Sequence, residues 1–166
     1  MIQKKVCMLG GFAVGKTSMV QRFVSSMFSD KYLTTVGVKI DKKVVETEGQ
    51  AVTMMLWDLA GEDEYQKIQT SYLRGAAGYL LVIDGTRIST LETARSIRER
   101  IEMELGQLPF VLAVNKADLK SDWEFEEADC AELLEEGWMV TETSAKTGKG
   151  IEQAFLDLAA AMIDRG

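Results

Sequence analysis

The sequence of 166 residues contains no histidine, a single proline and only two cysteines. The absence of histidine removes the commonest transition-metal ligand and the usual general base of enzymes. The two cysteines, Cys7 and Cys130, lie far apart, which indicates a reducing compartment with two unpaired thiols. No apolar run approaches the roughly 18 residues that a membrane-spanning helix needs. A disulfide scaffold and a membrane-spanning protein are therefore both disfavoured.

Basic charge is also scarce, since 19 lysines and arginines stand against 26 aspartates and glutamates, a net charge of −7. This balance disfavours binding to the phosphate backbone of nucleic acids. The length and the hydrophobic content of 46% predict one globular domain over residues 1–166. The basic start and apolar residues 6–14 resemble a secretory signal, but Gly10 and Gly11 interrupt the run and no small-residue cleavage site follows. We therefore expect a cytoplasmic protein.

Short apolar runs alternate with helical patterns along the chain. Strands are predicted at residues 5–9, 38–47, 51–58, 78–84, 110–115 and 138–143. Helices are predicted through residues 20–27, 65–72, 89–105, 127–136 and 151–162. Strands without alternation, separated by helices, indicate an α/β fold whose sheet is covered on both faces, and the hairpin around Glu48-Gly49 adds an antiparallel strand. Such folds bind ligands at the carboxyl ends of their strands.

The first candidate site is the segment from Gly10 to Thr17, which matches G-x-x-x-x-G-K-[ST] between a strand and a helix. Its glycines let successive backbone N–H groups point at phosphate oxygens, and the helix N-terminus adds its dipole. Lys16 can reach the β- and γ-phosphates, and the Thr17 hydroxyl can ligate Mg²⁺. The predicted nucleotide-binding residues of this loop are Gly11, Phe12, Ala13, Val14, Gly15, Lys16, Thr17 and Ser18.

This loop alone fits ATPases, kinases and GTPases equally, and the base is decided at Asn115-Lys116-Ala117-Asp118, just past a buried strand. The Asp118 carboxylate can accept from the N1–H and the exocyclic amine of guanine, whereas adenine has no N1–H to offer. Asn115 can brace the site and the Lys116 stem can cover the base. After the next strand, the N–H of Ala145 in Ser144-Ala145-Lys146 could donate to guanine O6. These residues favour a guanine nucleotide and disfavour the ATP-dependent alternatives.

Between these motifs stands Trp57-Asp58-Leu59-Ala60-Gly61. Asp58, at a strand end, can hold a water of the Mg²⁺ shell, and Gly61 leaves its N–H available to a γ-phosphate oxygen. Standing alone, the stretch would be read as an ordinary Asp/Gly turn.

Together and in this order, the motifs resemble those of the Ras superfamily of small GTPases, and Rab-like members most of all. The resemblance covers nearly the whole chain, including residues 32–37 and 72–78. It implies a P-loop small GTPase fold, with a six-stranded, mostly parallel sheet in the order 2-3-1-4-5-6 and helices on both faces. It also implies that Thr35 ligates Mg²⁺ and contacts the γ-phosphate, and that Phe28 stacks against the guanine edge. From the residues alone, Phe28 would be a core residue ending the first helix's stripe.

The resemblance further implies a switch that binds GTP or GDP with Mg²⁺. The γ-phosphate and Mg²⁺ would tether Thr35 and Gly61, and hydrolysis would release both loops and change the surface that a partner contacts. In the family, residues 32–37 correspond to switch I and the loop that contains Gly61 to switch II. Effector, exchange and activating proteins would bind switch I, switch II and the edge strand from Val38 to Val45. The lysines of that strand give it a positive charge, which serves either partner recognition or protection against edge-to-edge aggregation.

Two residues depart from the family pattern. Glu62 stands where the family usually has a glutamine that orients the attacking water, and an ionised carboxylate cannot donate to the γ-phosphate and repels it. Phe12 replaces a small residue; it either crowds the hydrolytic side of the site or packs on the switch II helix. The catalytic candidates are therefore Lys16, Thr35, Gly61 and Glu62, with slow hydrolysis expected.

Two functions remain open: a GTP-hydrolysing switch, and a GTP-binding docking module with negligible hydrolysis, which Glu62 and Phe12 favour. The last seven residues contain no cysteine and residue 2 is isoleucine, so we expect no prenyl or myristoyl anchor.

Overall fold

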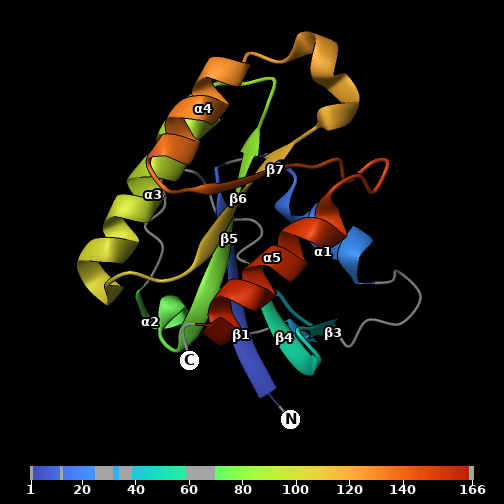
Figure 1. The fold of residues 1–166 in the computed structure, drawn as a ribbon, viewed down its shortest axis with the longest axis vertical. Coiled ribbons are helices and arrows are strands. Elements are labelled where there is room, and N and C mark those ends of the chain that lie inside the picture. Colours follow the sequence, from blue (N-terminus) through green and yellow to red (C-terminus); the bar gives the residue numbers. More distant parts are fainter. Residues whose placement is uncertain (1, 12, 25–31, 34–38, 59–69, 165–166) are drawn as a thin grey trace.

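The computed structural model describes residues 2–11, 13–24, 32–33, 39–58 and 70–164 (Figure 1). Its strands are β1 (Ile2–Gly10), β2 (Tyr32–Leu33), β3 (Lys39–Thr47), β4 (Gln50–Asp58), β5 (Ala76–Asp84), β6 (Phe110–Asn115) and β7 (Met139–Glu142). Its helices are α1 (Lys16–Phe23), α2 (Thr70–Leu73), α3 (Ser89–Leu105), α4 (Glu127–Glu135) and α5 (Ile151–Asp164), with a 3-10 segment, η1, over Ala117–Asp122. Every strand except the two-residue β2 lies where an apolar run predicts one.

These strands form one mixed sheet in the order β2-β3-β4-β1-β5-β6-β7. The pairs β4-β1, β1-β5, β5-β6 and β6-β7 are parallel, and the pairs β2-β3 and β3-β4 are antiparallel. The predicted order 2-3-1-4-5-6 is confirmed, because it corresponds to β3-β4-β1-β5-β6-β7. The short strand β2 extends this sheet beside Lys39 and Ile40 of β3.

The hairpin between β3 and β4 turns at Glu48 and Gly49, as predicted. Both residues have positive φ, at 51° and 76°, which is the backbone of a two-residue type I′ turn. Its twist matches that of the flanking strands, so Thr47 pairs directly with Gln50 and the register continues to Lys39 opposite Asp58.

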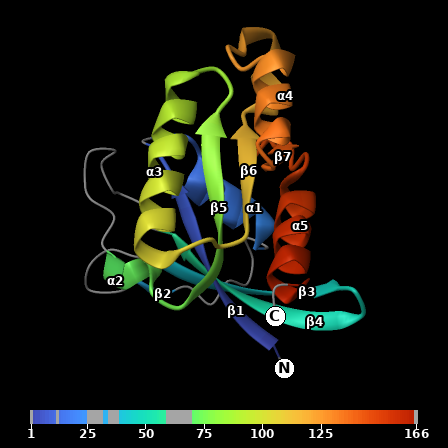
Figure 2. The ribbon, with the colours of Figure 1, turned by 60° about the vertical axis from the view of Figure 1, so that its left-hand side comes forward.

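Helices cover both faces of the sheet, as predicted (Figure 2). One core cluster joins α1 and α5 to the sheet, and in it the rings of Phe23 and Phe155 stack with centroids 3.9 Å apart. The other cluster joins α3 and α4 to the opposite face. The predicted stripe of the last helix is buried in full and comprises Ile151, Ala154, Phe155, Leu158 and Met162. Continuous apolar strands are thus explained by burial on both sides.

The first helix differs from its prediction at the C-terminal end. Helix α1 ends at Phe23, and Val24 is extended, with φ −89° and ψ 104°. Val24 is nevertheless buried, so its apolar character continues the helical pattern past the end of the helix. Met27 lies outside the described residues, as do Tyr65 and Ile68 of the helix predicted before Tyr72.

Both cysteines are free thiols, Cys7 buried and Cys130 half-buried, as predicted. Among the described residues, no helix combines the length and the apolar character needed to cross a membrane.

Candidate functional site

The loop between β1 and α1 presents a helix N-terminus at the carboxyl edge of the sheet. Gly15, directly before α1, has φ 102°, and a Cβ there would lie 2.3 Å from Asn115 Nδ2, so both backbone and space require glycine. No side chain caps α1 and no acidic residue occupies its first turn within the described part of the chain. The N-terminus of α1, which begins with Lys16 and Thr17, thus lies at this edge with the positive end of its helix dipole, as a site for an anion requires.

Thr17 and Asp58 are brought together although 41 residues separate them. The Thr17 hydroxyl donates to Asp58 Oδ2 at 2.8 Å. Asp58 is 1% exposed, and its Oδ1 is buried with no hydrogen-bond partner among the described residues. A hydroxyl oxygen beside a carboxylate with an unused oxygen is the donor set that Mg²⁺ prefers. The residues present therefore fit a magnesium ion.

Asn115 joins three segments of the site. Its Nδ2 donates to the Val14 carbonyl at 2.9 Å, and its Oδ1 accepts from the Thr143 hydroxyl and the Ala145 N–H at 3.2 and 3.3 Å. The side chain is 2% exposed, so these bonds satisfy a buried amide. Asn115 thus holds the phosphate loop, the end of β6 and the loop after β7 in a fixed relation, the bracing role that its position predicts.

A cavity of about 410 Å³ opens between these segments. Its lining comprises Gly15, Ser18, Asn115, Lys116, Asp118, Leu119, Ala145 and Lys146. All of these except Leu119 are predicted nucleotide-binding residues. The cavity therefore joins the two ends of the predicted site, the helix N-terminus and the Asn115–Asp118 turn.

Asp118 is oriented by Ser144, whose hydroxyl donates to Asp118 Oδ1 at 2.7 Å. Ser144 is itself fully buried and accepts from the Thr147 N–H at 3.1 Å. A carboxylate has about four acceptor positions, so this bond leaves Asp118 able to accept from a ligand.

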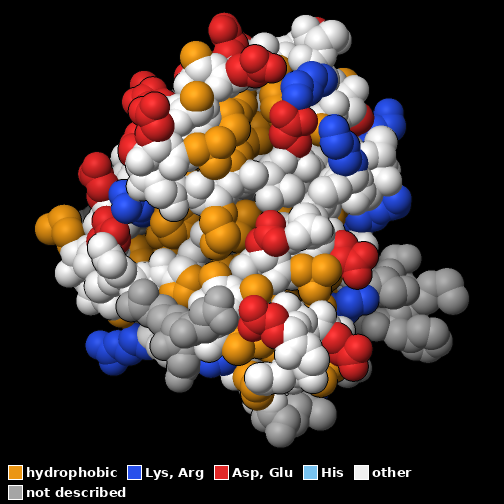
Figure 3. All heavy atoms as spheres, viewed as in Figure 1, with side chains coloured by type: hydrophobic (Ala, Val, Ile, Leu, Met, Phe, Trp, Pro, Cys, Tyr) orange, Lys and Arg blue, Asp and Glu red, His pale blue; other side chains and the backbone are white. Residues whose placement is uncertain are grey.

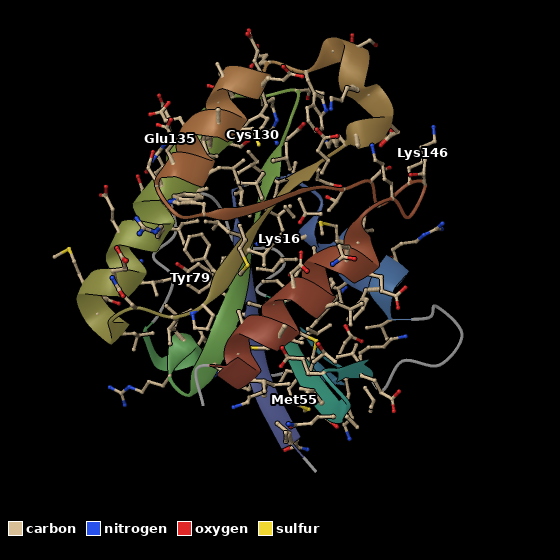
Figure 4. The ribbon with its side chains drawn as sticks, viewed as in Figure 1. Lys16, Met55, Tyr79, Cys130, Glu135 and Lys146 are labelled. Carbon is tan, nitrogen blue, oxygen red and sulfur yellow. The ribbon has the colours of Figure 1, made fainter. Side chains whose placement is uncertain are left out.

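Ala145 and Lys146 follow on the loop between β7 and α5. The predicted bond from the Ala145 N–H to guanine O6 stays a prediction; here this N–H donates to Asn115. Lys146 is exposed and its side chain points outward from the loop (Figure 4). Gly11, Ala13 and Val14 lie on the phosphate loop as predicted, with Gly11 and Val14 buried and Ala13 exposed.

Asp84 is a site residue that the sequence reasoning missed. It ends β5, is 1% exposed, and its Oδ2 lies 2.9 Å from Lys116 Nζ. Burial raises the pKa of Asp84, but hydrogen bonds from Lys116, Thr86 and Arg87 outweigh this effect and lower it to about 2. The signal was available, since Asp84, like Asp58 and Asn115, is a polar residue closing a buried strand.

Trp123 is a second missed residue. Its Nε1 donates to the Lys116 carbonyl at 2.8 Å, seven residues back along the chain. Nothing in the residues around Trp123 predicts this contact, because it depends on the path of η1 and the turn after it.

Five predicted residues lie outside the described part of the chain: Phe12, Phe28, Thr35, Gly61 and Glu62. Their predicted roles are therefore neither supported nor opposed by this geometry.

Comparison with known proteins agrees with this arrangement. A family model described as the Ras family matches residues 5–164. The chain is 34% identical over 158 residues to Ras-related protein RABE1e of Arabidopsis thaliana, covering 93% of this chain and 72% of that protein. It is 32% identical over 160 residues to Ras-related protein Rab-13 of Canis lupus familiaris, covering 93% and 77%. It is 32% identical over 164 residues to GTP-binding protein yptV2 of Volvox carteri, covering 97% and 76%.

The strand order, the loop before α1 and the matches over nearly the whole chain lead to one conclusion. The chain belongs to the Ras family and is a Rab-like small GTPase of the Ras superfamily.

Proposed function

We propose that this protein is a molecular switch that binds GTP or GDP together with Mg²⁺. The observation that carries the proposal is the cavity between the N-terminus of α1 and Asp118, a carboxylate held in place by buried Ser144. A phosphate chain suits one end of this cavity and a purine with hydrogen-bond donors suits the other. The proposed unit is the single domain of residues 1–166.

At the base end, Asp118 accepts from the N1–H and the exocyclic amine of guanine. Asn115 fixes the edge of the cavity, because its amide binds both the Val14 carbonyl and the Ala145 N–H. Lys116 covers the base with its methylene stem, and Phe28 stacks on the guanine edge.

At the phosphate end, Lys16 neutralises the β- and γ-phosphates and the N–H groups of residues 13–18 donate to their oxygens. Thr17, Thr35 and Asp58 would hold Mg²⁺, Asp58 through a bound water. Held there, the metal would neutralise negative charge on the phosphates. Thr35 and Gly61 contact the γ-phosphate, so loss of that group frees both loops and changes the surface offered to effector, exchange and activating proteins.

Two forms of the proposed function differ in the rate at which bound GTP is hydrolysed. Lys16, Thr35, Gly61 and Glu62 are the catalytic residues of a GTP-hydrolysing switch, which we expect to be slow without a partner. Glu62 in place of glutamine, together with Phe12, favours the alternative of a docking module that retains GTP. Single-turnover hydrolysis of bound GTP by the pure protein separates the two: measurable release of phosphate supports the switch, and none over many hours supports the docking module.

Nucleotide choice tests the assignment itself. Asp118→Asn places an amide opposite two guanine donors, so GTP affinity should fall on the order of a hundredfold, about 3 kcal/mol. Xanthosine nucleotides, which carry a carbonyl where guanine has its amine, should gain relative affinity. Titration calorimetry with GTP, ATP and xanthosine triphosphate measures all three.

The matched control is Asp122→Asn, the same change at an exposed position of η1 that does not line the cavity. It should leave the GTP affinity at the wild-type value. Equal binding of ATP and GTP by the wild type, or an unchanged guanine preference in Asp118→Asn, would overturn the assignment.

A further inference from the structure

Lys116, which lines the cavity, has a strained backbone conformation. Its φ of 72° and ψ of 39° lie in the left-handed region, which residues with a side chain rarely adopt. Such a conformation persists only where the surroundings hold it. Within its own turn, the Lys116 carbonyl accepts from the Leu119 N–H at 2.9 Å. Two further contacts from outside this turn hold Lys116, one at its main chain and one at its ammonium group.

The main-chain contact comes from Trp123. Its indole N–H donates to the Lys116 carbonyl at 2.8 Å. The ring itself lies against Gly85, where an added Cβ would come within 2.2 Å of Trp123 Cε2. The Gly85 carbonyl accepts from the Glu124 and Phe125 N–H groups at 2.8 and 3.1 Å, which fixes the segment that carries the indole. Trp123 therefore buttresses the Asn115–Asp118 turn from the β5 side.

The ammonium contact comes from Asp84. Its carboxylate is 1% exposed and accepts from the Thr86 hydroxyl at 2.7 Å and from Arg87 Nε at 3.0 Å, so its position is determined before Lys116 approaches. Lys116 Nζ then lies 2.9 Å from Asp84 Oδ2. Trp123 thus holds Lys116 at its carbonyl and Asp84 holds it at its ammonium group. The four methylenes between these two contacts lie beside the cavity of about 410 Å³.

We infer that Asp84 and Trp123 are positioning residues that hold the Lys116 stem in place as a ready-made wall of the base pocket. The inference rests on the proposed binding of a guanine nucleotide at this cavity. Lysine is a flexible side chain, and ordering it before the ligand arrives removes that cost from the binding step. Neither residue touches the nucleotide; each acts through Lys116.

The test measures dissociation of a fluorescent GDP analogue in the presence of Mg²⁺. Asp84→Asn releases the ammonium group, and Trp123→Phe keeps a ring against Gly85 but removes the N–H donor. Each should speed dissociation by about threefold to tenfold, the range expected for one long side chain that must be ordered on binding. Asp122→Asn is the matched control, because it makes the same change at an exposed position that does not line the cavity, so it should release the analogue at the wild-type rate.

A double-mutant cycle separates positioning from a general structural effect. In a Lys116→Met background, Asp84→Asn should change the dissociation rate by less than about twofold, because the group through which it acts is gone. A full effect in that background, or wild-type rates in both Asp84→Asn and Trp123→Phe, overturns the inference. If Asp84→Asn fails to fold, the Trp123→Phe rate alone decides it. Failure of the wild type to bind the analogue would instead contradict the proposed function.

Discussion

Several side chains of the site, Asn115 among them, are held by groups from other strand ends. Asn115 contacts the Val14 carbonyl, Thr143 and the Ala145 N–H, so its loss would loosen three segments at once. Gly15 is required by the same amide, because any Cβ there would collide with Asn115 Nδ2. Single residues here set the relation between loops, whereas the proposed contacts to phosphate and base come from backbone N–H groups and a few charged atoms.

The first prediction at the scale of single residues concerns Glu62. An ionised carboxylate beside the γ-phosphate repels it and cannot donate to it, so Glu62→Gln should speed single-turnover GTP hydrolysis between about tenfold and a hundredfold at neutral pH. The difference in hydrolysis rate between Glu62→Gln and wild type should become smaller as the pH falls toward the range in which carboxylates protonate. Phosphate release measured over a pH series gives both results.

Glu64→Gln, the same change two residues further on, is the control for a general charge effect and should leave the rate unaltered. A slower Glu62→Gln would show that the carboxylate accepts from the attacking water. Equal rates at every pH would remove Glu62 from the reaction.

At the scale of elements, the predicted partner edge is shorter and less uniform than the sequence suggests. Strand β2 pairs with Lys39 and Ile40, so the outer edge of β3 within the described residues runs from Asp41 to Thr47. The pleat also divides the positive charge between two faces. Lys43 lies over the Phe23 ring on the α1 side, at 5.4 Å from its centroid, whereas Lys42 is exposed on the opposite face.

Charge reversal can therefore locate a partner. Lys42→Glu and Lys43→Glu, made separately, should each leave nucleotide affinity intact, and the one on the contacted face should weaken a GTP-dependent partner and reduce the salt sensitivity of its binding. Binding at low and high salt measures this. Arg100→Glu on α3 carries the same charge change away from the edge and should have no effect. If a partner binds both lysine variants as it binds wild type, the lysines only guard the edge against aggregation.

At the scale of the whole molecule, surface charge is acidic on the side of α4. Glu127, Glu132 and Glu135 are exposed there, and Figure 3 shows acidic side chains over this region, with Glu135 pointing outward in Figure 4. Acidic charge on this side would repel a nucleic-acid backbone, and the expectation that the protein binds none stays a prediction.

The stability of the whole fold should depend on pH through Asp84. Its pKa falls from 3.8 to about 2 on folding, so the ionised form stabilises the folded state. The contribution, roughly 2 kcal/mol, is complete above the unfolded value and is lost as the pH falls through the folded value. Wild type should therefore lose about 1 kcal/mol relative to Asp84→Asn between pH 5 and pH 3.

Urea unfolding of both proteins, with nucleotide removed, measures this difference, and every other carboxylate is common to the two. A free-energy gap that stays constant between pH 5 and pH 3 would show that Asp84 gains nothing from ionisation in the fold.

Local patterns in the sequence were sufficient to place every strand except β2, and to mark the loop before α1 and the Asn115–Asp118 turn that line the cavity. Apolar periodicity marks buried elements, Gly49 readily takes the positive φ of a tight turn, and the glycine loop before α1 follows from backbone freedom. The order of the strands came from the resemblance to a family, because pairing between distant strands leaves no trace in any short stretch.

Tertiary structure decided what depends on distant groups meeting. Val24 is extended but buried, and a buried apolar residue fits the helical pattern whether or not it is helical. The hydrophobic pattern therefore could not mark the end of α1. Strand β2 and the division of the lysines between two faces follow from pairing and pleat. The Asp84–Lys116 pair joins the ends of β5 and β6, 32 positions apart, and such a contact exists only once parallel strands bring their carboxyl ends to one edge.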